Sequence, residues 1–301
     1  MLFRSMIGRM STLQFNQSGV STILDAQAQV SRLQEQIGTG KRTLTPSDDP
    51  SASAKLSTLK TELSKIDSFQ KNISFITSAL SFEEVALNSA NDVLLRIREL
   101  AIQAQNGTLA QSDRDAIATE IDELREQLLN VSNTQDAAGQ YIFSGSASTT
   151  PAYSVAGVFQ GDNLVREVNI GANIRIAEGH SAADIFEGAN ATSNTFTVLS
   201  ELSTALRQND AATIAASFSD VDRSIEKLSS VRTSVGVRMN WVDKQSALNE
   251  NFNLALTRTI SEIEDLDIAE AIGRLQLQMV SLQAAQQTFV KTQNLSLFNY
   301  L

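Results

Sequence analysis

Apolar residues recur every seven positions between Pro50 and Gly107. The unbroken series is Leu59, Ile66, Ile73, Leu80, Leu87, Leu94 and Ala101. A second series starts at Leu56 and Leu63, shifts register, and continues through Phe69, Ile76, Ala90, Ile97 and Ala104. Such a repeat predicts an α-helix with one buried face. With Asp49-Pro50 as a start signal and Gly107 as a stop signal, the predicted helix is roughly 80 Å long at 1.5 Å per residue and covers residues 51–106.

The C-terminal half carries a matching apolar stripe. Its members are Ile214, Phe218, Val221, Ile225, Leu228, Val235, Met239, Val242, Leu248, Phe252, Leu256, Ile260, Ile263 and Leu266. Two helical stretches of similar length, far apart in sequence, can pack antiparallel as the arms of one hairpin. An ordinary helical bundle would also use such stripes, but helices of this length favour a rod. A shorter helix is expected between them, from near Ser112 to near Gly139.

Residues 139–192 interrupt the helical pattern. Seven of the fourteen glycines lie between Gly139 and Gly188, and short runs such as Tyr141-Ile142-Phe143 stand between Gly, Asn and Asp residues. This composition is typical of short strands joined by turns. We therefore predict a small β-rich domain here, at the far tip of the helical hairpin.

Two shorter amphipathic helices are predicted at the chain ends. Their apolar residues recur at spacings of three and four, and each helix spans about three or four heptads, which is marginal for an isolated helix in water. Each stripe therefore needs a partner, and the most economical partner is the other terminus together with neighbouring molecules. The residues expected to pack are Ile23, Val30, Leu33 and Ile37 near the N-terminus and Ile268, Ile272, Leu275, Met279, Leu282 and Phe289 near the C-terminus.

These patterns predict a mainly α fold with a small β-rich insertion, built on a long antiparallel helical hairpin or coiled-coil rod. Five segments follow from them. Residues 1–45 and 267–301 form the two halves of a terminal-helix domain. Residues 46–138 and 193–266 form the two halves of the helical rod domain, and residues 139–192 form the β-rich domain.

Net charge and hydropathy exclude several classes of partner. The chain carries a formal net charge of −10 and has a pI near 4.7, which argues against nucleic acid. No stretch approaches the roughly 18 uninterrupted apolar residues of a membrane span. The first residues lead to no apolar run that could serve as a cleavable secretory signal. We expect no nucleic acid and no membrane among the partners.

The residue types that carry most enzyme chemistry are scarce. The chain has no cysteine and one histidine, which excludes disulfides, a zinc ribbon, an iron–sulfur site and a thiol nucleophile. The single histidine, His180, is interpreted as a surface turn residue. Gly38-Thr39-Gly40-Lys41 lacks the first part of a phosphate-binding loop and does not follow a predicted strand. The sequence predicts no catalytic residues, no metal site, no cofactor and no enzymatic activity.

The carboxylates near residues 48 and 265 are interpreted as helix-capping residues rather than as metal ligands. Ser261-x-x-Glu264 has the form of a capping box, and further carboxylates follow it, as suits a helix N-terminus. No glycine stands where an EF-hand loop needs one, and no histidine is nearby in sequence. The residues assigned to helix capping or to terminal motifs are Asp48, Asp49, Pro50, Ser261, Glu264, Asp265 and Asp267.

These residues belong to two motifs that resemble the terminal signatures of the flagellin-like axial proteins. The N-terminal motif is Gln36-Ile37-Gly38-Thr39-Gly40-Lys41-Arg42 followed by Pro46-Ser47-Asp48-Asp49-Pro50, and the C-terminal motif runs from Ser261 to Glu270. The resemblance covers nearly the whole chain. The segments that are more similar to the hook–filament junction members of the family than to its filament subunits are residues 139–145, Pro151, residues 159–162 and residues 235–238.

The resemblance implies a structural part of the bacterial flagellum. It implies export in an unfolded state by a type III route to an extracellular position, and terminal helices that order only on assembly. These helices would form an inner tube, the rod the next shell and the β-rich domain the outer face of an adaptor ring between hook and filament. The implied partners are hook-associated protein 1, flagellin, further copies of the chain side by side, an export chaperone and the type III export apparatus.

The sequence leaves two alternative classes of protein open. A flagellin filament subunit would share both terminal signatures, and a helical-hairpin signalling or scaffold protein would have no need for free terminal heptads. One departure from the family concerns the start, which is usually Met-Arg-Ile-Ser-Thr. Here Arg9-Met10-Ser11-Thr12 follows eight further residues, so residues 1–8 are either a short extension or the product of an early start codon.

Overall fold

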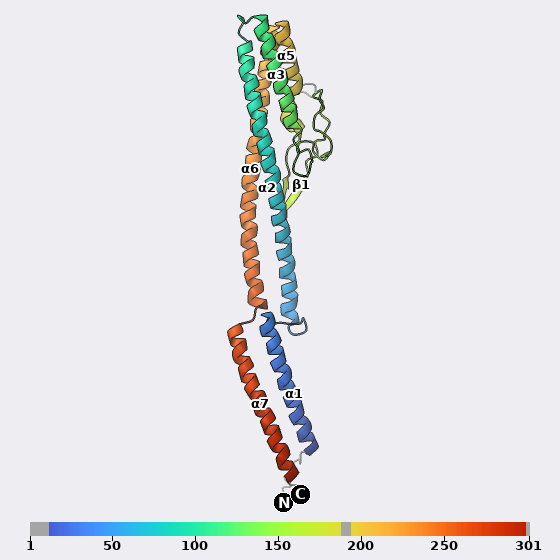
Figure 1. Cartoon of the computed structure of the whole chain (residues 1–301), viewed down its shortest axis with the longest axis vertical. Helices are drawn as coiled ribbons and strands as arrows, with labels where there is room; N and C mark the ends of the chain where they lie inside the picture. The colour runs from blue at the N-terminus through green and yellow to red at the C-terminus, as the bar shows by residue number, and fades with distance from the viewer. Residues whose placement is uncertain (1–11, 188–193, 299–301) are drawn as a thin grey trace, which may run out of the picture. The chain divides into compact units, whose positions relative to one another are not determined.

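The computed structural model describes residues 12–187 and 194–298, and these residues are mainly helical (Figure 1). The elements in chain order are α1 (Thr12–Thr39), α2 (Pro50–Ala104), α3 (Gln111–Ser132), β1 (Glu167–Gly171), β2 (Ile174–Ala177), α4 (Ala182–Phe186), α5 (Thr195–Gln208), α6 (Ala211–Glu264) and α7 (Ile268–Phe298). The predicted mainly α fold with a small β insertion is thereby confirmed. The predictions for residues 1–8 and for residues 188–192 lie outside the described residues.

The chain divides into two compact units. The terminal unit comprises Met1–Ser64 and Leu254–Leu301, and the central unit comprises Lys65–Asn253. The long helices α2 and α6 contribute to both. The terminal unit holds α1 and α7, whereas the central unit holds the sheet and the shorter helices α3, α4 and α5.

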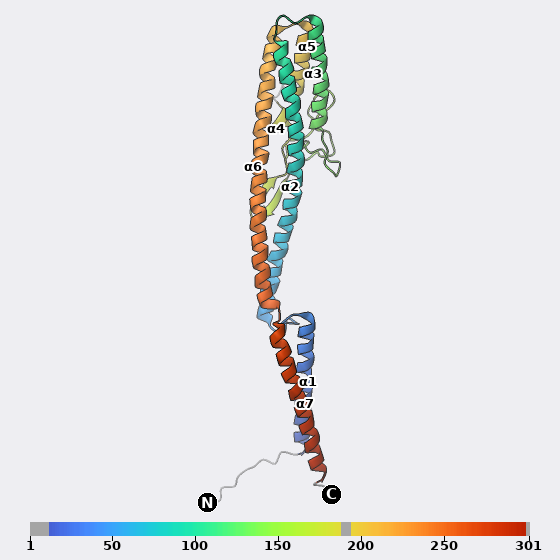
Figure 2. The ribbon, with the colours of Figure 1, turned by 60° about the vertical axis from the view of Figure 1, so that its left-hand side comes forward.

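In the central unit, α2 and α6 run antiparallel and share one hydrophobic core (Figures 1 and 2). Gln70 donates to Ser246 (Nε2–Oγ, 2.6 Å), and Arg98 pairs with Asp222 (2.5 Å), so the partner in α6 moves backward along the chain as the position in α2 moves forward. The buried face of α2 follows spacings of three and four, as a heptad repeat requires. Its residues are Ile73, Ile76, Leu80, Glu83, Ala86, Leu87, Ala90, Val93, Leu94, Ile97, Leu100, Ala101 and Ala104.

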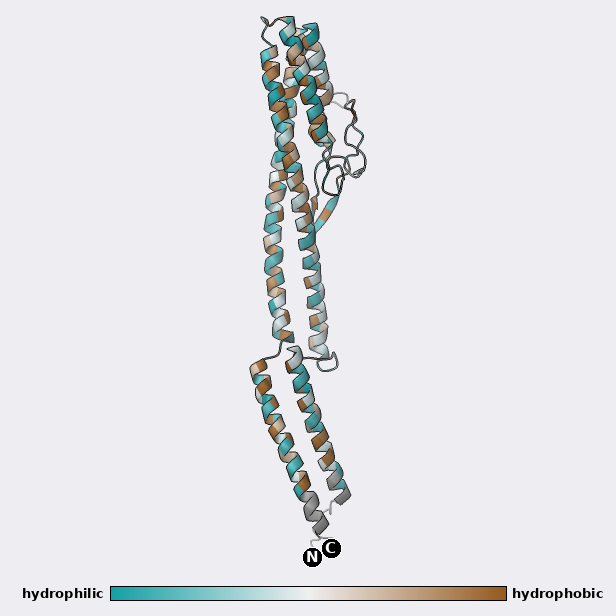
Figure 3. Cartoon of the chain, in the orientation of Figure 1, coloured by the Kyte–Doolittle hydropathy of each residue, from teal (hydrophilic) through white to brown (hydrophobic). Residues whose placement is uncertain are grey.

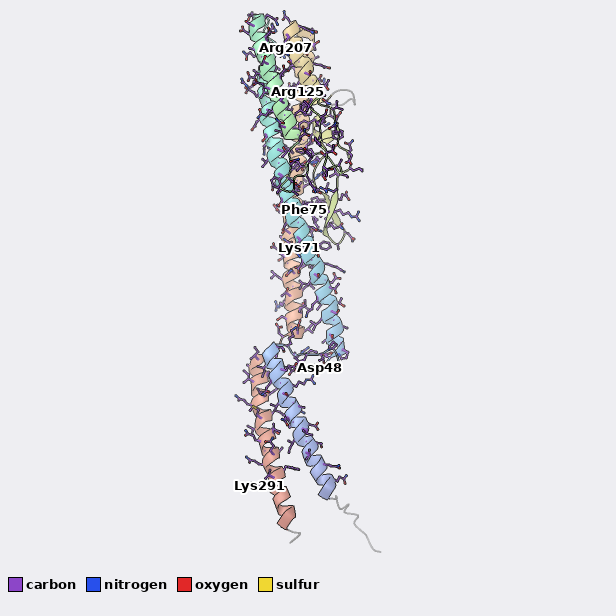
Figure 4. The ribbon with its side chains drawn as sticks, turned by 45° about the vertical axis from the view of Figure 1, so that its right-hand side comes forward. Asp48, Lys71, Phe75, Arg125, Arg207 and Lys291 are labelled. Atoms are coloured by element: carbon purple, nitrogen blue, oxygen red, sulfur yellow. The ribbon has the colours of Figure 1, made fainter. Side chains whose placement is uncertain are left out.

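The helices α3 and α5 pack against each other in the same unit. Arg125 of α3 donates to the carbonyl of Phe196 (Nε–O, 3.1 Å), and Arg207 of α5 pairs with Asp122 of α3 (2.6 Å; both arginines are labelled in Figure 4). The described part of the predicted rod segment 193–266 is therefore two helices, because the chain reverses between α5 and α6.

Two chain reversals form one end of the central unit. The buried guanidinium of Arg114 donates to the Ala104 carbonyl (Nη1–O, 3.1 Å) and so caps the C-terminus of α2. Asn209 ends α5 in the left-handed conformation, with φ 55°. The prediction that the β-rich segment occupies this tip is wrong. That segment lies beside α2, where Asn72 donates to the Asn169 carbonyl (Nδ2–O, 2.7 Å), because α3 carries the chain back along the hairpin.

The sheet is also smaller than predicted. β1 and β2 form an antiparallel pair with a bulge between Asn169 and Gly171, and the other described residues of segment 139–192 form turns, isolated bridges and the short helix α4. Tyr141-Ile142-Phe143 is not a strand, because Tyr141 forms only an isolated bridge with Gln135, and Ile142 and Phe143 lie in a turn. Nearby, Asp162 Oδ1 accepts hydrogen bonds from the N–H groups of Ser146 (2.7 Å) and Leu164 (3.1 Å). Such side-chain bonds satisfy the backbone without a strand partner.

Tyr153 is the centre of an aromatic cluster in the central unit. Its ring centroid lies 4.6 Å from that of Phe196, 5.5 Å from that of Phe159 and 6.1 Å from that of Phe186. Its hydroxyl donates to Glu187 Oε1 (3.2 Å). Burial in this apolar cluster, with the negative charge of Glu187 beside it, raises the pKa of the Tyr153 hydroxyl.

Tyr153 is expected to make the protein less stable in alkali. Below the pKa of an unfolded tyrosine, about 10, the Tyr153 hydroxyl is protonated in both the folded and the unfolded chain, and its contribution to the free energy of unfolding is complete. Above it, the unfolded chain loses this proton while the folded chain keeps it, so the free energy of unfolding falls by about 1.4 kcal/mol per pH unit. Urea unfolding followed by circular dichroism between about pH 10 and 11.5 should show a shallower pH dependence for Tyr153→Phe. Equal slopes for wild type and Tyr153→Phe would contradict the assignment.

Candidate assembly surface

The terminal unit is built around the antiparallel pair of α1 and α7 (Figures 1 and 2). At the end next to the loop after α1, the Arg42 N–H donates to the Glu264 carbonyl (2.8 Å) and the Leu266 N–H donates to the Gly40 carbonyl (2.9 Å). These backbone bonds join the segment that follows α1 to the segment that precedes α7. The register of the two terminal helices is thereby set from one end.

Further along the pair, the contacts keep the same register. Gln278 of α7 donates to Gln29 of α1 (Nε2–Oε1, 2.8 Å). Beyond this, Gly19 lies directly against the ring of Phe289, where a Cβ atom would be 2.7 Å from Cδ2. Glycine at position 19 therefore permits the close approach of α1 to this ring.

The structure places most of the predicted packing residues in the seam between α1 and α7. The half-buried ones are Ile23, Val30, Leu33 and Ile37 on α1 and Leu275, Leu282 and Phe289 on α7. The other three predicted residues are not in the seam, since Ile268, Ile272 and Met279 are 51%, 42% and 43% exposed. The sequence prediction chose large apolar residues on α7, whereas the seam also uses the small residues Ala271 and Ala285, at spacings of three and four from Leu275, Gln278 and Leu282.

Large apolar side chains remain exposed on both helices of the pair. Figure 3 shows hydrophobic residues along both helices, and the exposed ones are Val20 and Leu24 on α1 and Ile268, Ile272, Leu277, Met279, Val280 and Val290 on α7. In the terminal unit, Ala271 is the one fully buried residue among those whose side chains are described. The pair thus exposes much of the apolar surface that a helix of a folded protein normally buries.

Glu264, at the end of α6, holds the loop that follows α1. Its carboxylate pairs with Lys41 (2.7 Å) and with Lys60 of α2 (2.6 Å). The hydrogen bond from Lys41, followed by that from Lys60, lowers the pKa of the Glu264 carboxyl, and the same contact raises the pKa of the Lys41 ammonium. Glu264 therefore joins three segments of the terminal unit through charged hydrogen bonds.

The predicted capping box at Ser261 and Glu264 is wrong. Both residues lie in the last turn of α6 rather than at the start of a helix, and the Ser261 hydroxyl bonds the Asp265 carboxylate. The helix start falls after a short break, where Asp267 Oδ1 accepts a hydrogen bond from the Glu270 N–H (3.0 Å) at the N-terminus of α7. The motif has the spacing of a capping box, but its glutamate is engaged by two lysines.

The neighbouring residues Asp48 and Asp49 make different contacts: Asp49 caps the N-terminus of α2, and Asp48 closes the turn before it. Asp49 Oδ1 accepts from the Ala52 N–H (2.9 Å) at the start of α2. Asp48 instead closes the turn before the helix, because its Oδ2 accepts from the Thr45 N–H (3.0 Å) while its Oδ1 pairs with Arg32 of α1 (2.7 Å; Asp48 is labelled in Figure 4). The Thr45 N–H bond is the main cause of the lowered pKa of the Asp48 carboxyl.

The interpretation of His180 as a surface turn residue is wrong. Its side chain is 10% exposed and lies inside the central unit, with Nδ1 2.7 Å from Glu83 Oε1 on α2 and Nε2 3.3 Å from Ser234 Oγ on α6. The sequence contained a signal for this site: Glu83 occupies the place that the second apolar series of α2 skips between Ile76 and Ala90. A charged residue at a core position of a heptad repeat indicates a buried polar contact.

Within residues 12–187 and 194–298, no helix combines the length and the apolar content of a membrane span. In the same ranges, no group of three or more histidine, aspartate or glutamate side chains is arranged to hold a metal ion.

The chain matches the family models of both flagellin terminal regions. The bacterial flagellin N-terminal helical region matches residues 10–148, and the bacterial flagellin C-terminal helical region matches residues 218–301. The N-terminal match includes α1, α2 and α3, and the C-terminal match includes α7 and most of α6.

Individual relatives extend the likeness over nearly the whole chain. Flagellar hook-associated protein 3 of Escherichia coli (strain K12) is 30% identical over 96% of this chain and 98% of its own length. A solved flagellar hook-associated protein from Vibrio parahaemolyticus is 26% identical, covers 72% of this chain and 100% of its own, and has a TM-score of 0.68. The flagellar junction protein FlgL from Legionella pneumophila shares the fold, with 20% identity, coverage of 70% and 100%, and a TM-score of 0.58. The chain therefore belongs to the flagellin family, as a relative of flagellar hook-associated protein 3, and is a structural protein of the bacterial flagellum.

Proposed function

We propose that the protein is the adaptor that joins the flagellar hook to the filament, as a ring of copies side by side. The observation that carries the proposal is the exposed apolar surface on α1 and α7, in a chain whose relatives include hook-associated protein 3. A two-helix pair whose seam residues are only half-buried, and whose other apolar residues are exposed, needs further helices to complete its core. In this proposal the further helices are the equivalent helices of neighbouring copies, of hook-associated protein 1 and of flagellin.

The five predicted segments acquire roles in this proposal. Residues 1–45 and 267–301 line the inner tube of the assembly, and residues 46–138 with 193–266 form the next shell. Residues 139–192 face outward. The proposal draws on the division between an incompletely buried terminal unit and a central unit that has a continuous core.

Export through a type III channel belongs to the same proposal. A chain that must pass unfolded through a narrow channel benefits from the absence of cysteine, because no disulfide can form. A terminal unit with one fully buried residue among its described side chains costs little to unfold, and its apolar stripes offer an export chaperone a binding surface before assembly.

Deletion of the gene is expected to leave cells with hooks but without filaments, and with flagellin released into the medium. Electron microscopy of isolated hooks and immunoblots of the culture supernatant measure both results. A plasmid carrying the wild-type gene should restore filaments. Normal filaments in the deletion strain would contradict the junction role.

A filament subunit is the second candidate, because the family models that match are those of flagellin termini. The purified protein, overproduced and concentrated, distinguishes the two. Long helical filaments formed by this chain without other proteins would favour a flagellin role. Short or absent polymers, together with bald hooks in the deletion strain, would favour the adaptor.

A further inference from the structure

A cavity of about 270 Å³ lies in the central unit, between α2 and the turns that precede and follow the sheet. Its apolar walls include Phe75 and Phe82 on α2, together with Tyr141 and Ile142 from the turn segment (Phe75 is labelled in Figure 4). Phe75 and Phe82 are also large exposed apolar residues, at 50% and 44%. The cavity therefore opens between aromatic side chains that the fold itself leaves uncovered, and its size suits a small ligand.

Glu83 gives this cavity a buried carboxylate. The residue lines the cavity and is 2% exposed. Its Oε1 contacts His180 Nδ1 (2.7 Å), whereas its Oε2 is buried and has no hydrogen-bond partner among the described residues. A buried carboxylate oxygen without a donor is costly, so such atoms in folded proteins are normally paired.

The wall beside this oxygen is backbone. Gly179 also lines the cavity, and a Cβ atom there would lie 3.5 Å from Glu83 Oε2. The Gly179 carbonyl accepts a hydrogen bond from Arg238 of α6 (Nη1–O, 2.8 Å), which holds this wall in place. The absence of a side chain at position 179 thus leaves space next to the unpaired oxygen.

The charges around the cavity favour a cation. Its lining includes three carboxylates, Glu83, Asp136 and Glu178, and one permanent cation, Arg166. Arg166 is already paired with Glu178 (2.9 Å). Aromatic faces next to a carboxylate are the chemistry with which proteins bind organic cations. A metal ion is not favoured, since no three histidine, aspartate or glutamate side chains among the described residues are grouped so that they could hold one.

We propose that this cavity binds a small organic cation, an ammonium or guanidinium group on a short apolar chain, with Glu83 Oε2 as the acceptor of its N–H group. The aromatic walls would cover the apolar chain, and Gly179 would provide the space for the cationic end. The same chemistry is present in a free amine and in a lysine or arginine side chain of another protein. The proposal does not depend on the junction role, because every residue involved lies in the central unit.

Titration of the full-length protein with n-butylammonium chloride and with Nα-acetyl-lysine methylamide tests the proposal. Two-dimensional NMR of the Gly179 amide or calorimetry reports binding. Saturable binding of either cation, at least tenfold tighter than that of n-butanol, supports the proposal. Preference for the lysine derivative points to a protein partner, and preference for n-butylammonium points to a free amine. No saturable binding of either cation, or equal binding of n-butanol, overturns the proposal.

Three variants locate the binding. Glu83→Gln should weaken cation binding at least tenfold, and Glu84→Gln should not, because Glu84 pairs instead with Arg232 on α6 (3.3 Å). Gly179→Ala should also weaken binding tenfold, since its methyl group fills the space at Oε2 at an ordinary contact distance. This variant keeps the test decisive if Glu83→Gln fails to fold. Undiminished binding by a folded Gly179→Ala variant would contradict the assigned site.

Discussion

Replacement of Leu33 by aspartate is expected to abolish filament attachment while the central unit stays folded. Leu33 lies half-buried in the seam between α1 and α7, within the terminal unit. In the assembled state this position would be surrounded by helices, and an unpaired carboxylate there costs on the order of several kcal/mol in each copy. Because a ring repeats the defect in every copy, we expect motility and filament number to fall to the level of the deletion strain. Leu275→Asp, on the opposite side of the seam, should have the same effect.

Four measurements check this expectation. Swimming assays and electron microscopy report assembly, and thermal unfolding followed by circular dichroism reports the central unit. Limited proteolysis of the purified monomer should cleave residues 1–45 and 267–301 first, around a resistant core, in wild type and variant alike. Gln27→Asp, at an exposed polar position of α1, is the matched control and should assemble normally. Normal filaments with Leu33→Asp, or a loss of core helicity, would show that the two units do not divide their roles in this way.

The opposite behaviour is expected of Leu87→Ala in the central unit. Leu87 is fully buried in the heptad face of α2, and removal of three carbon atoms from a packed core leaves a cavity. The free energy of unfolding should fall by about 2–5 kcal/mol. Assembly should be affected only in proportion to the loss of folded protein.

Urea unfolding of the full-length chain measures this loss. Val85→Ala removes apolar carbon from the same helix, but Val85 is 65% exposed, so the free energy of unfolding of this variant should stay within about 0.5 kcal/mol of that of wild type. Equal shifts for the two variants would contradict the assignment of the α2 core face. Leu87→Ala and Val85→Ala report the contacts that stabilise the monomer, whereas Leu33→Asp reports the contacts that assembly would complete.

The heptad pattern predicted where α2 begins and ends. It predicted less completely which residues of α7 pack against α1. Spacings of three and four placed α2 within a few residues of its observed bounds, because helix formation depends on residues close in sequence. On α7, the same reasoning selected Ile268, Ile272 and Met279, which the monomer leaves exposed. Which side of an apolar helix faces its neighbour depends on how closely the two backbones approach, and here the small residue Ala271 is the buried one.

The sequence indicated the buried contact between Glu83 and His180 only through a missing apolar residue in the second heptad series of α2. Between Ile76 and Ala90, the seven-residue step falls on Glu83, and this predicts a buried carboxylate without naming its partner. The partner is His180, 97 residues later in the chain. It lies in a turn that the sequence predicts to be exposed. The two meet because α3 returns the chain along α2, so that the turn before α4 lies against the middle of α2.

The sequence by itself determined the mainly helical fold, the approximate bounds of α2, the two terminal stripes and the resemblance to flagellin-like proteins. Each of these depends on local periodicity or on contiguous motifs. The tertiary structure decided that the β hairpin lies beside the long helices, that Glu264 holds a loop rather than starting a helix, and that Glu83 meets His180 at the wall of a cavity. These features depend on chain reversals at Arg114 and Asn209, and contacts between distant residues follow from such reversals and not from the spacing within any one helix.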